Sequence, residues 1–202
     1  MKDTYRTIAV PSEEVLFKDR NSKFYGFAFP VSTEQEVKNH LDALKKQHYQ
    51  ARHWCYAWVI GEKYEHFRAN DDGEPNNSAG APIYGQLQSF DLTNVLVVVV
   101  RYFGGTKLGV GGLIHAYKTA AKMALETTTI LELTIDIQFK IRFEYPLMNV
   151  VMRLIKEEGI KIIDQEMTLK CVFVLAIRAQ ESDRVISLVK NIFGVQIIED
   201  LD

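Results

Sequence analysis

The residues from Val95 to Leu125 constrain the fold of this chain more than any other segment. The segment opens with six consecutive apolar residues, Val95 to Val100, which are too few to span a membrane and are typical of a strand buried on both faces. Five of the twelve glycines then fall within positions 104–112, which predicts a loop. A helix is expected after the loop, because alanines recur at positions 116, 120 and 124 and form a stripe that can lie close to a sheet.

The same segment contains no Asp or Glu but includes Arg101 and Lys107. A glycine-rich loop exposes backbone N–H groups, and the N-terminus of the following helix also attracts negative charge. We therefore expect a phosphate-like or sulfate-like anion to bind at the glycine loop. The predicted anion- or nucleic-acid-binding residues are Arg101, Gly104, Gly105, Lys107, Gly109, Gly111 and Gly112.

Arg101 and Lys107 each have a simpler interpretation. The Arg101 guanidinium can instead form a structural ion pair with an acidic residue of the loop at 71–75, which would join two loops. Lys107 can be an ordinary solvated lysine. Neither the P-loop motif nor the dinucleotide-binding motif fits RYFGGTKLGVGGL, so the sequence predicts neither an NTPase nor a Rossmann site.

Three further basic or titratable residues lie on the expected helix, at i, i+3 and i+7. They are His115, Lys118 and Lys122. This spacing places them on one helix face, and a solvated face opposite the alanine stripe is the favoured interpretation.

The segment ARHWCYAWVI at 51–60 alternates as a strand does. One face combines Arg52 with three aromatic residues, a pattern that suits stacking on nucleic-acid bases. The favoured alternative is that helices cover this face as a second core layer. The other face carries His53 and Cys55, which could form a nucleophile pair, but Ala57 and Val59 follow on that face and indicate core.

The loop 71–75 holds three carboxylates, Asp71, Asp72 and Glu74. Such a group could provide a general base or bind Mg²⁺, although its spacing matches no specific metal loop. We therefore expect no cofactor, with Mg²⁺ as the one candidate, and no catalytic residue is assigned. Ser78 is expected to cap a helix over about 79–90 whose start is a second candidate anion site. The residues expected to support the site are Arg52, His53, Asp71, Asp72 and Glu74.

Composition sets broad limits on the function. The formal net charge is −2, and basic and acidic residues are nearly balanced before and after residue 132, so any nucleic-acid contact must come from a local patch. The two cysteines, Cys55 and Cys171, are expected to be buried free thiols. The sequence shows no signal peptide and no apolar run long enough for a membrane helix, so we expect a cytoplasmic protein without a membrane partner.

The pattern of elements divides the chain near residue 132. Residues 1–132 read as strands and helices built around the valine strand. Residues 133–202 read as strand, helix, two strands, helix and strand, the order of a ferredoxin-like module. The fold class is therefore α+β with two domains, 1–132 and 133–202. The segment 171–177 is apolar at every position, so we expect both faces of its sheet to be covered.

Three blocks of this sequence resemble the IMPACT/YigZ family. They are ARHWCYAW at 51–58, DDGEPNNSAGAP at 71–82 and RYFGGTKLGVGGL at 101–113, in the order and spacing of the family. The resemblance implies a first domain of the ribosomal-protein and elongation-factor βαβ type and a second domain similar to domain V of elongation factor G. Here His115 stands where the family usually has arginine, and Asn76–Asn77 replaces the serine and glycine that follow the proline.

The resemblance implies a non-catalytic protein that binds RNA, the ribosome or a translation factor and takes part in translational regulation. The alternative is an enzyme acting on a phosphorylated or peptide-like small molecule. In that case Arg101 and Lys107 would hold the anion, and Asp72, Glu74 or His53 would provide acid–base chemistry. The oligomeric state cannot be deduced from the sequence.

Overall fold

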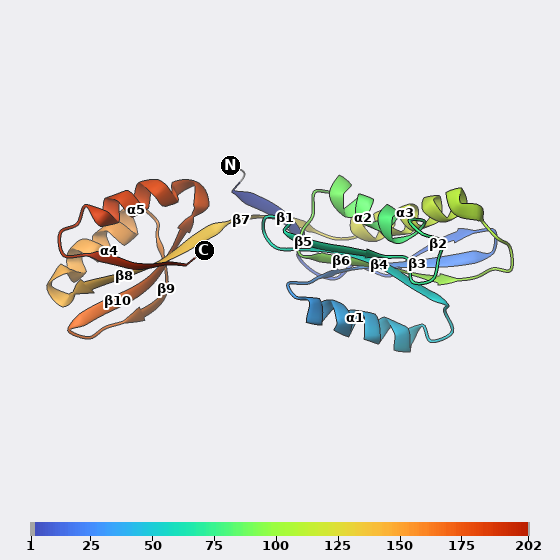
Figure 1. The fold of residues 1–202 in the computed structure, drawn as a ribbon, viewed down its shortest axis with the longest axis horizontal. Coiled ribbons are helices and arrows are strands. Elements are labelled where there is room, and N and C mark those ends of the chain that lie inside the picture. The colour runs from blue at the N-terminus through green and yellow to red at the C-terminus, as the bar shows by residue number, and fades with distance from the viewer. Residues whose placement is uncertain (1–2, 202) are drawn as a thin grey trace. The chain divides into compact units, whose positions relative to one another are not determined.

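The computed structural model describes residues 3–201 of the chain, which is a mixed α and β protein. Two compact units are present. One comprises Tyr5–Leu133, and the other combines the chain up to Thr4 with the segment from Thr134 onward. Figure 1 shows the helices and strands of each unit.

A five-stranded sheet forms the centre of the first unit, in the order β2-β3-β6-β4-β5. Every neighbouring pair in this sheet is antiparallel. The strands are β2 (Val15–Asp19), β3 (Ser22–Pro30), β4 (His53–Ile60), β5 (His66–Asn70) and β6 (Val95–Tyr102). Two further strands, β1 (Thr4–Ile8) and β7 (Ile130–Thr134), pair in a separate two-stranded sheet.

Helices cover both faces of the five-stranded sheet. Helix α1 (Glu34–Gln47) lies on one face, and α2 (Gly80–Ser89) and α3 (Gly109–Glu126) lie on the other (Figure 1). The residues of β6 from Val95 to Val100 are all fully buried, which confirms the prediction of a strand covered on both sides. A capping box is present at the start of α1, where Thr33 and Glu36 exchange side-chain-to-backbone hydrogen bonds.

Helix α3 packs very closely on the sheet. Ala116, Ala120 and Ala124 are fully buried, as the alanine stripe predicts. A Cβ atom on Gly26 of β3 would lie 2.5 Å from the carbonyl oxygen of Ala120, so only glycine fits at position 26. The helix begins at Gly109, and the predicted loop over 104–112 is therefore too long: the last three of its glycines belong to the first turn.

The prediction that Ser78 caps α2 is wrong, because another residue provides the cap. Ser78 donates its hydroxyl to the Pro75 carbonyl oxygen and caps nothing. The carboxylate of Asp71 instead accepts the N–H groups of Ala79 and Gly80, at 2.9 and 2.8 Å. The N-terminus of α2 is therefore occupied by the chain's own carboxylate, which excludes it as the second anion site.

The second unit is built on a four-stranded antiparallel sheet in the order β11-β8-β10-β9. Its strands are β8 (Asp136–Glu144), β9 (Lys161–Glu166), β10 (Lys170–Arg178) and β11 (Gln196–Leu201). Two short 3-10 turns, η1 (Tyr145–Leu147) and η2 (Ala179–Glu181), lead into the helices α4 (Met148–Glu157) and α5 (Ser182–Lys190). The predicted order of strand, helix, two strands, helix and strand is present.

Both helices of the second unit cover the same face of its sheet (Figure 1). Phe173 and Leu175 of β10 point into this core and are fully buried. Val172 and Val174 lie on the other face and are half-buried. That this face is covered by a partner or by the first unit stays a prediction. Across residues 3–201, no helix is both long and apolar enough to cross a membrane.

Candidate ligand-binding site

The strand register places three side chains in one row across the first sheet. Arg101 near the end of β6 is paired with Phe24 on β3 and with His53 on β4. All three lie on the sheet face that α2 and α3 cover, because Val97 and Val99, at even spacing from Arg101, pack in the core of that face. The row brings a cation, an aromatic ring and an imidazole together at the end of the buried strand.

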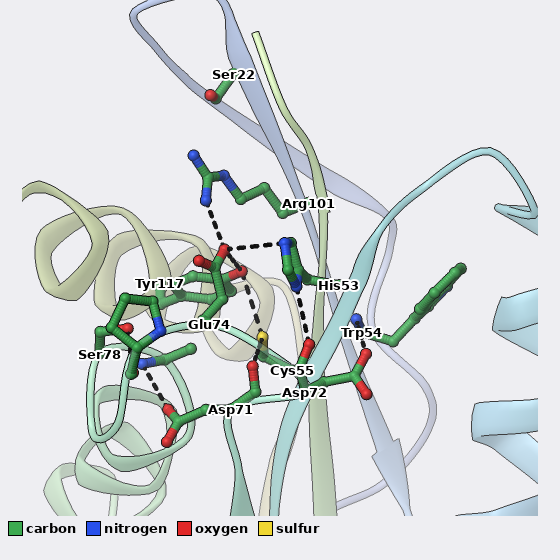
Figure 2. Close-up of polar contacts among 12 residues, drawn as sticks. Ser22, His53, Trp54, Cys55, Asp71, Asp72, Glu74, Ser78, Arg101 and Tyr117 are labelled. Carbon is green, nitrogen blue, oxygen red and sulfur yellow. Dashed lines mark hydrogen bonds and ion pairs between the residues drawn. The ribbon is translucent and has the colours of Figure 1, made fainter. Parts of the chain in front are cut away.

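Arg101 forms a buried ion pair with Glu74. Its Nη1 donates to Oε1 of Glu74 at 2.6 Å, and only 6% and 4% of the two side chains are exposed. The guanidinium carbon lies 5.5 Å from the ring centroids of both Phe24 and Phe103. The Nε–H of Arg101 has no hydrogen-bond partner among the described residues. The ion pair that the sequence left open for Arg101 is therefore present, with Glu74 as the partner (Figure 2).

One further side chain donates to the Glu74 carboxylate, and a thiol contacts that side chain in turn. The hydroxyl of Tyr117 on α3 donates to Oε1 of Glu74 at 2.8 Å, and the thiol of Cys55 lies 3.3 Å from the Tyr117 oxygen. Burial raises the pKa of the Tyr117 hydroxyl and that of the Cys55 thiol far above their ordinary values. Cys55 is fully buried in the core of the first unit, which supports the core interpretation of this strand face.

His53 has a fixed orientation beside the ion pair. Its Nδ1 lies 2.8 Å from the backbone carbonyl oxygen of Asp72, and because a carbonyl only accepts, Nδ1 carries the proton. The other ring nitrogen, Nε2, lies 4.0 Å from Oε1 of Glu74. This Nε2 is not engaged by the Asp72 carbonyl and faces the ion pair (Figure 2).

The three carboxylates of the 71–75 loop have separate roles. Asp71 caps α2, and the Asp72 carboxylate accepts the backbone N–H of Trp54 at 2.7 Å. Only Glu74 reaches the ion pair with Arg101. Among the described residues there is no group of three or more His, Cys, Asp or Glu side chains that could hold a metal ion.

A cavity of about 420 Å³ opens beside the ion pair. Its polar residues are His53, Glu74, Arg101 and Lys107. Its remaining walls are Pro75, Phe103, Leu108, Gly109, Val110 and Leu113. Phe103 is 52% exposed and Val110 is also 52% exposed, so these two side chains are accessible to a ligand from solvent.

The structure brings some of the predicted site residues together and leaves others apart. Arg101, Lys107 and Gly109 line the cavity, together with His53 and Glu74 of the supporting set. The cavity lining does not include Gly104, Gly105, Gly111, Gly112, Arg52, Asp71 or Asp72. A role of these seven residues in binding stays a prediction.

Gly104 has a structural reason to be glycine. A Cβ atom at this position would lie 2.1 Å from the backbone carbon of Asn21, and the Gly104 N–H donates to the Ser22 hydroxyl at 3.1 Å. Its N–H group is therefore occupied within the protein, and the glycine permits a close approach of two chain segments.

The structure also shows the surroundings of two further faces considered for binding, one on α3 and one on β4. His115, Lys118 and Lys122 are exposed and do not line the cavity. On β4, the face that includes Trp54, Tyr56 and Trp58 packs in the core beneath α1. Trp58 is only 4% exposed, so the favoured interpretation of this face as a second core layer is confirmed.

The sequence reasoning missed Tyr117 and Phe103. Tyr117 is adjacent to Ala116, on the side of α3 that faces the sheet. A buried hydroxyl at such a position needs a hydrogen-bond partner. That requirement is a signal for a polar group inside the core. Phe103 gave no separate signal, because a single aromatic residue next to a glycine pair is common on protein surfaces.

Comparisons with known proteins find similarity to one protein family. The family profile described as Impact N-terminal domain matches residues 20–125, more than half of the chain. YvyE of Bacillus subtilis (strain 168), an IMPACT family member, is 41% identical over 132 residues, which are 65% of this chain and 60% of YvyE. The match thus spans less than two thirds of YvyE.

Two further relatives match a larger share of the chain. The IMPACT family member YigZ of Escherichia coli (strain K12) is 31% identical over 149 residues, which are 73% of each chain. The crystal structure of a hypothetical protein is 27% identical, with a TM-score of 0.73, and the match covers 98% of this chain and 99% of that one.

Proposed function

Because the chain belongs to the IMPACT family, we propose that it is a non-catalytic protein of the translation apparatus that binds RNA and helps to regulate translation. The RNA-binding surface in this proposal is the mouth of the cavity beside Arg101. A translational role, in turn, favours a cytoplasmic location. The resemblance to IMPACT proteins supports the translational part, and the chemistry of the cavity supports RNA as the ligand.

The observation that carries the proposal is that Lys107 and the buried Arg101 line one cavity whose rim includes an exposed aromatic ring. Lys107 is exposed and available to a phosphate, and the start of α3 beside it lacks a side-chain cap. An exposed cation next to an aromatic ring suits single-stranded RNA, since a phosphate and an unstacked base can be contacted together.

In this proposal Arg101 has a structural role, whereas the sequence first indicated a direct contact with the anion. Its Nη1 donates to Glu74, and its guanidinium carbon lies over the rings of Phe24 and Phe103. It therefore supports the cavity from inside, and Lys107 is the residue that we expect to contact phosphate. Replacing Arg101 would test folding as much as binding.

The experiment is a titration of single-stranded RNA at several salt concentrations with Lys107→Ala. For one lost phosphate contact, the slope of log affinity against log salt should decrease by about 0.7, with weaker binding at low salt. Lys118→Ala is the matched control, since Lys118 is also exposed and lies outside the cavity. An unchanged slope and affinity for Lys107→Ala would refute the proposed contact.

The finer description of the fold belongs to the same proposal. We infer a ferredoxin-like fold for the second unit, similar to domain V of elongation factor G, and the order β11-β8-β10-β9 with two helices on one face supports this. For the first unit, β3 and β4 run in the same direction on either side of β6, with α1 between them in sequence. This arrangement supports a βαβ unit of the ribosomal-protein and elongation-factor type.

One observation favours an enzyme as the second candidate. His53 presents Nε2 within 4.0 Å of the Glu74 carboxylate at the cavity, a position in which it could accept a proton from a small phosphorylated or peptide-like substrate. Asp72 is a weaker candidate for this role, because it does not line the cavity and its carboxylate accepts the Trp54 N–H. An enzyme of this kind should lose turnover in His53→Gln while its stability stays unchanged.

A further inference from the structure

The cavity beside Arg101 is more apolar than a phosphate-binding site requires. Phe103, Leu108, Val110 and Leu113 form most of its walls, and an anion gains nothing from apolar contacts that remove its water. The volume of about 420 Å³ lies within the range of small-molecule sites. Part of the ligand should therefore be an uncharged group with a large apolar surface.

The polar end of the cavity offers both donors and acceptors. Arg101 and His53 both line the cavity. The Nε–H of the buried Arg101 has no partner among the described residues, and Nε2 of His53 is the ring nitrogen that the Asp72 carbonyl does not engage. The Glu74 carboxylate also lines the cavity and would repel a carboxylate or phosphate placed there. A neutral planar ring whose edge carries both a donor and an acceptor satisfies these groups, and each nucleobase has such an edge.

We propose that the cavity accommodates one unpaired base of the bound RNA. The base lies against the ring of Phe103 with its edge toward Arg101 and His53, and its phosphate remains at the mouth beside Lys107. This inference rests on the proposed function, and it specifies that the first unit recognises a base extruded from a single strand rather than the backbone alone.

The arrangement separates two contributions to affinity. Lys107 contributes a phosphate contact that depends on salt and requires no base. Phe103 contributes stacking, and any base can stack on it. An abasic oligomer loses this stacking but keeps the charge of the RNA. The two contributions can therefore be removed independently.

The test compares a single-stranded oligoadenylate with an abasic ribose-phosphate oligomer of the same length and charge. The wild-type protein should bind oligoadenylate about tenfold more tightly, the effect of one base stacked on an aromatic ring. Phe103→Leu should remove this preference and leave the affinity for the abasic oligomer unchanged. Phe67→Leu is the matched control, because Phe67 is similarly exposed, at 59% against 52%, and does not line the cavity.

Each outcome decides a different point. A preference lost in Phe103→Leu and kept in Phe67→Leu supports the base site. Equal binding of both oligomers, weakened by Lys107→Ala, overturns the base site and leaves the proposed function standing. If both oligomers bind equally and neither Phe103→Leu nor Lys107→Ala changes the affinity, RNA binds at another surface. The cavity would then be available to an apolar side chain of a protein partner. No binding of either oligomer overturns both proposals.

Discussion

At the scale of single residues, the ion pair between Arg101 and Glu74 determines what the site can do. Both charges are buried, so each depends on the other for compensation in a medium of low polarity. Tyr117 donates to the same carboxylate and holds it in place. The pair fixes the end of β6 to the 71–75 loop and thereby forms the inner end of the cavity.

Removing one partner of this pair should be strongly destabilising. Glu74→Ala leaves the Arg101 charge buried without compensation, and we expect the free energy of unfolding to decrease by about 3–5 kcal/mol. The comparison is Glu126→Ala, which removes the exposed pair with Lys122 and should lower that free energy by less than about 1 kcal/mol. Urea unfolding of both variants measures the difference. Equal effects would show that the buried pair is not structurally important.

His48 should make the stability of the first unit depend on pH. Its ring is 8% exposed, and burial lowers its pKa, against a smaller opposite effect of the Glu14 carboxylate. Above about pH 6.5 the ring is neutral in both the folded and the unfolded chain. As the pH falls below that value, the unfolded chain takes up a proton first, so the free energy of unfolding decreases.

This dependence can be assigned to His48 by substitution. We expect His48→Gln to show a shallower decrease in the free energy of unfolding between about pH 7 and about pH 5.5 than the unchanged protein. His66→Gln, at an exposed position, should retain the full decrease. Urea unfolding across this range is the measurement, and identical curves for His48→Gln and the unchanged protein would exclude the assignment.

At the scale of elements, periodicity alone predicted most strands and helices of the chain. It located β6 and the alanine stripe of α3, because each has a simple repeat of apolar or small residues. It misplaced the start of α3, since glycine has a low intrinsic helix propensity that the packing of this helix overrides. It also could not select the partner of Arg101, because three carboxylates within four residues look alike until the loop geometry separates them.

Two glycines at the ends of the 104–111 segment should respond in opposite ways to alanine. Gly104→Ala should be destabilising, because its Cβ would lie 2.1 Å from the backbone of Asn21. Gly111 lies in the first turns of α3 with nothing within 4 Å of an added Cβ, so Gly111→Ala should stabilise by about 0.5–1 kcal/mol.

Thermal unfolding monitored by circular dichroism measures both effects. The expected order of melting temperatures is Gly111→Ala, the unchanged protein and then Gly104→Ala. A melting temperature for Gly104→Ala equal to that of the unchanged protein would show that the segment is free to move away from Asn21.

At the scale of the whole molecule, the chain combines two units with separate hydrophobic cores. The overall net charge of −2 provides no general attraction to RNA, so the proposed binding requires a local site. The sequence pointed to the end of the valine strand, and the cavity lies there. It could not indicate the cavity, because its walls come from segments that only the folded sheet brings together.

The most direct test of the account is to map where RNA contacts the chain. Single-stranded RNA cross-linked to the protein by ultraviolet light, followed by mass spectrometry of the cross-linked peptides, gives this map. We predict cross-links in the segment 101–113, with Phe103 among the modified residues, and their loss in Lys107→Ala at moderate salt. Cross-links confined to residues 134–198 would contradict the account.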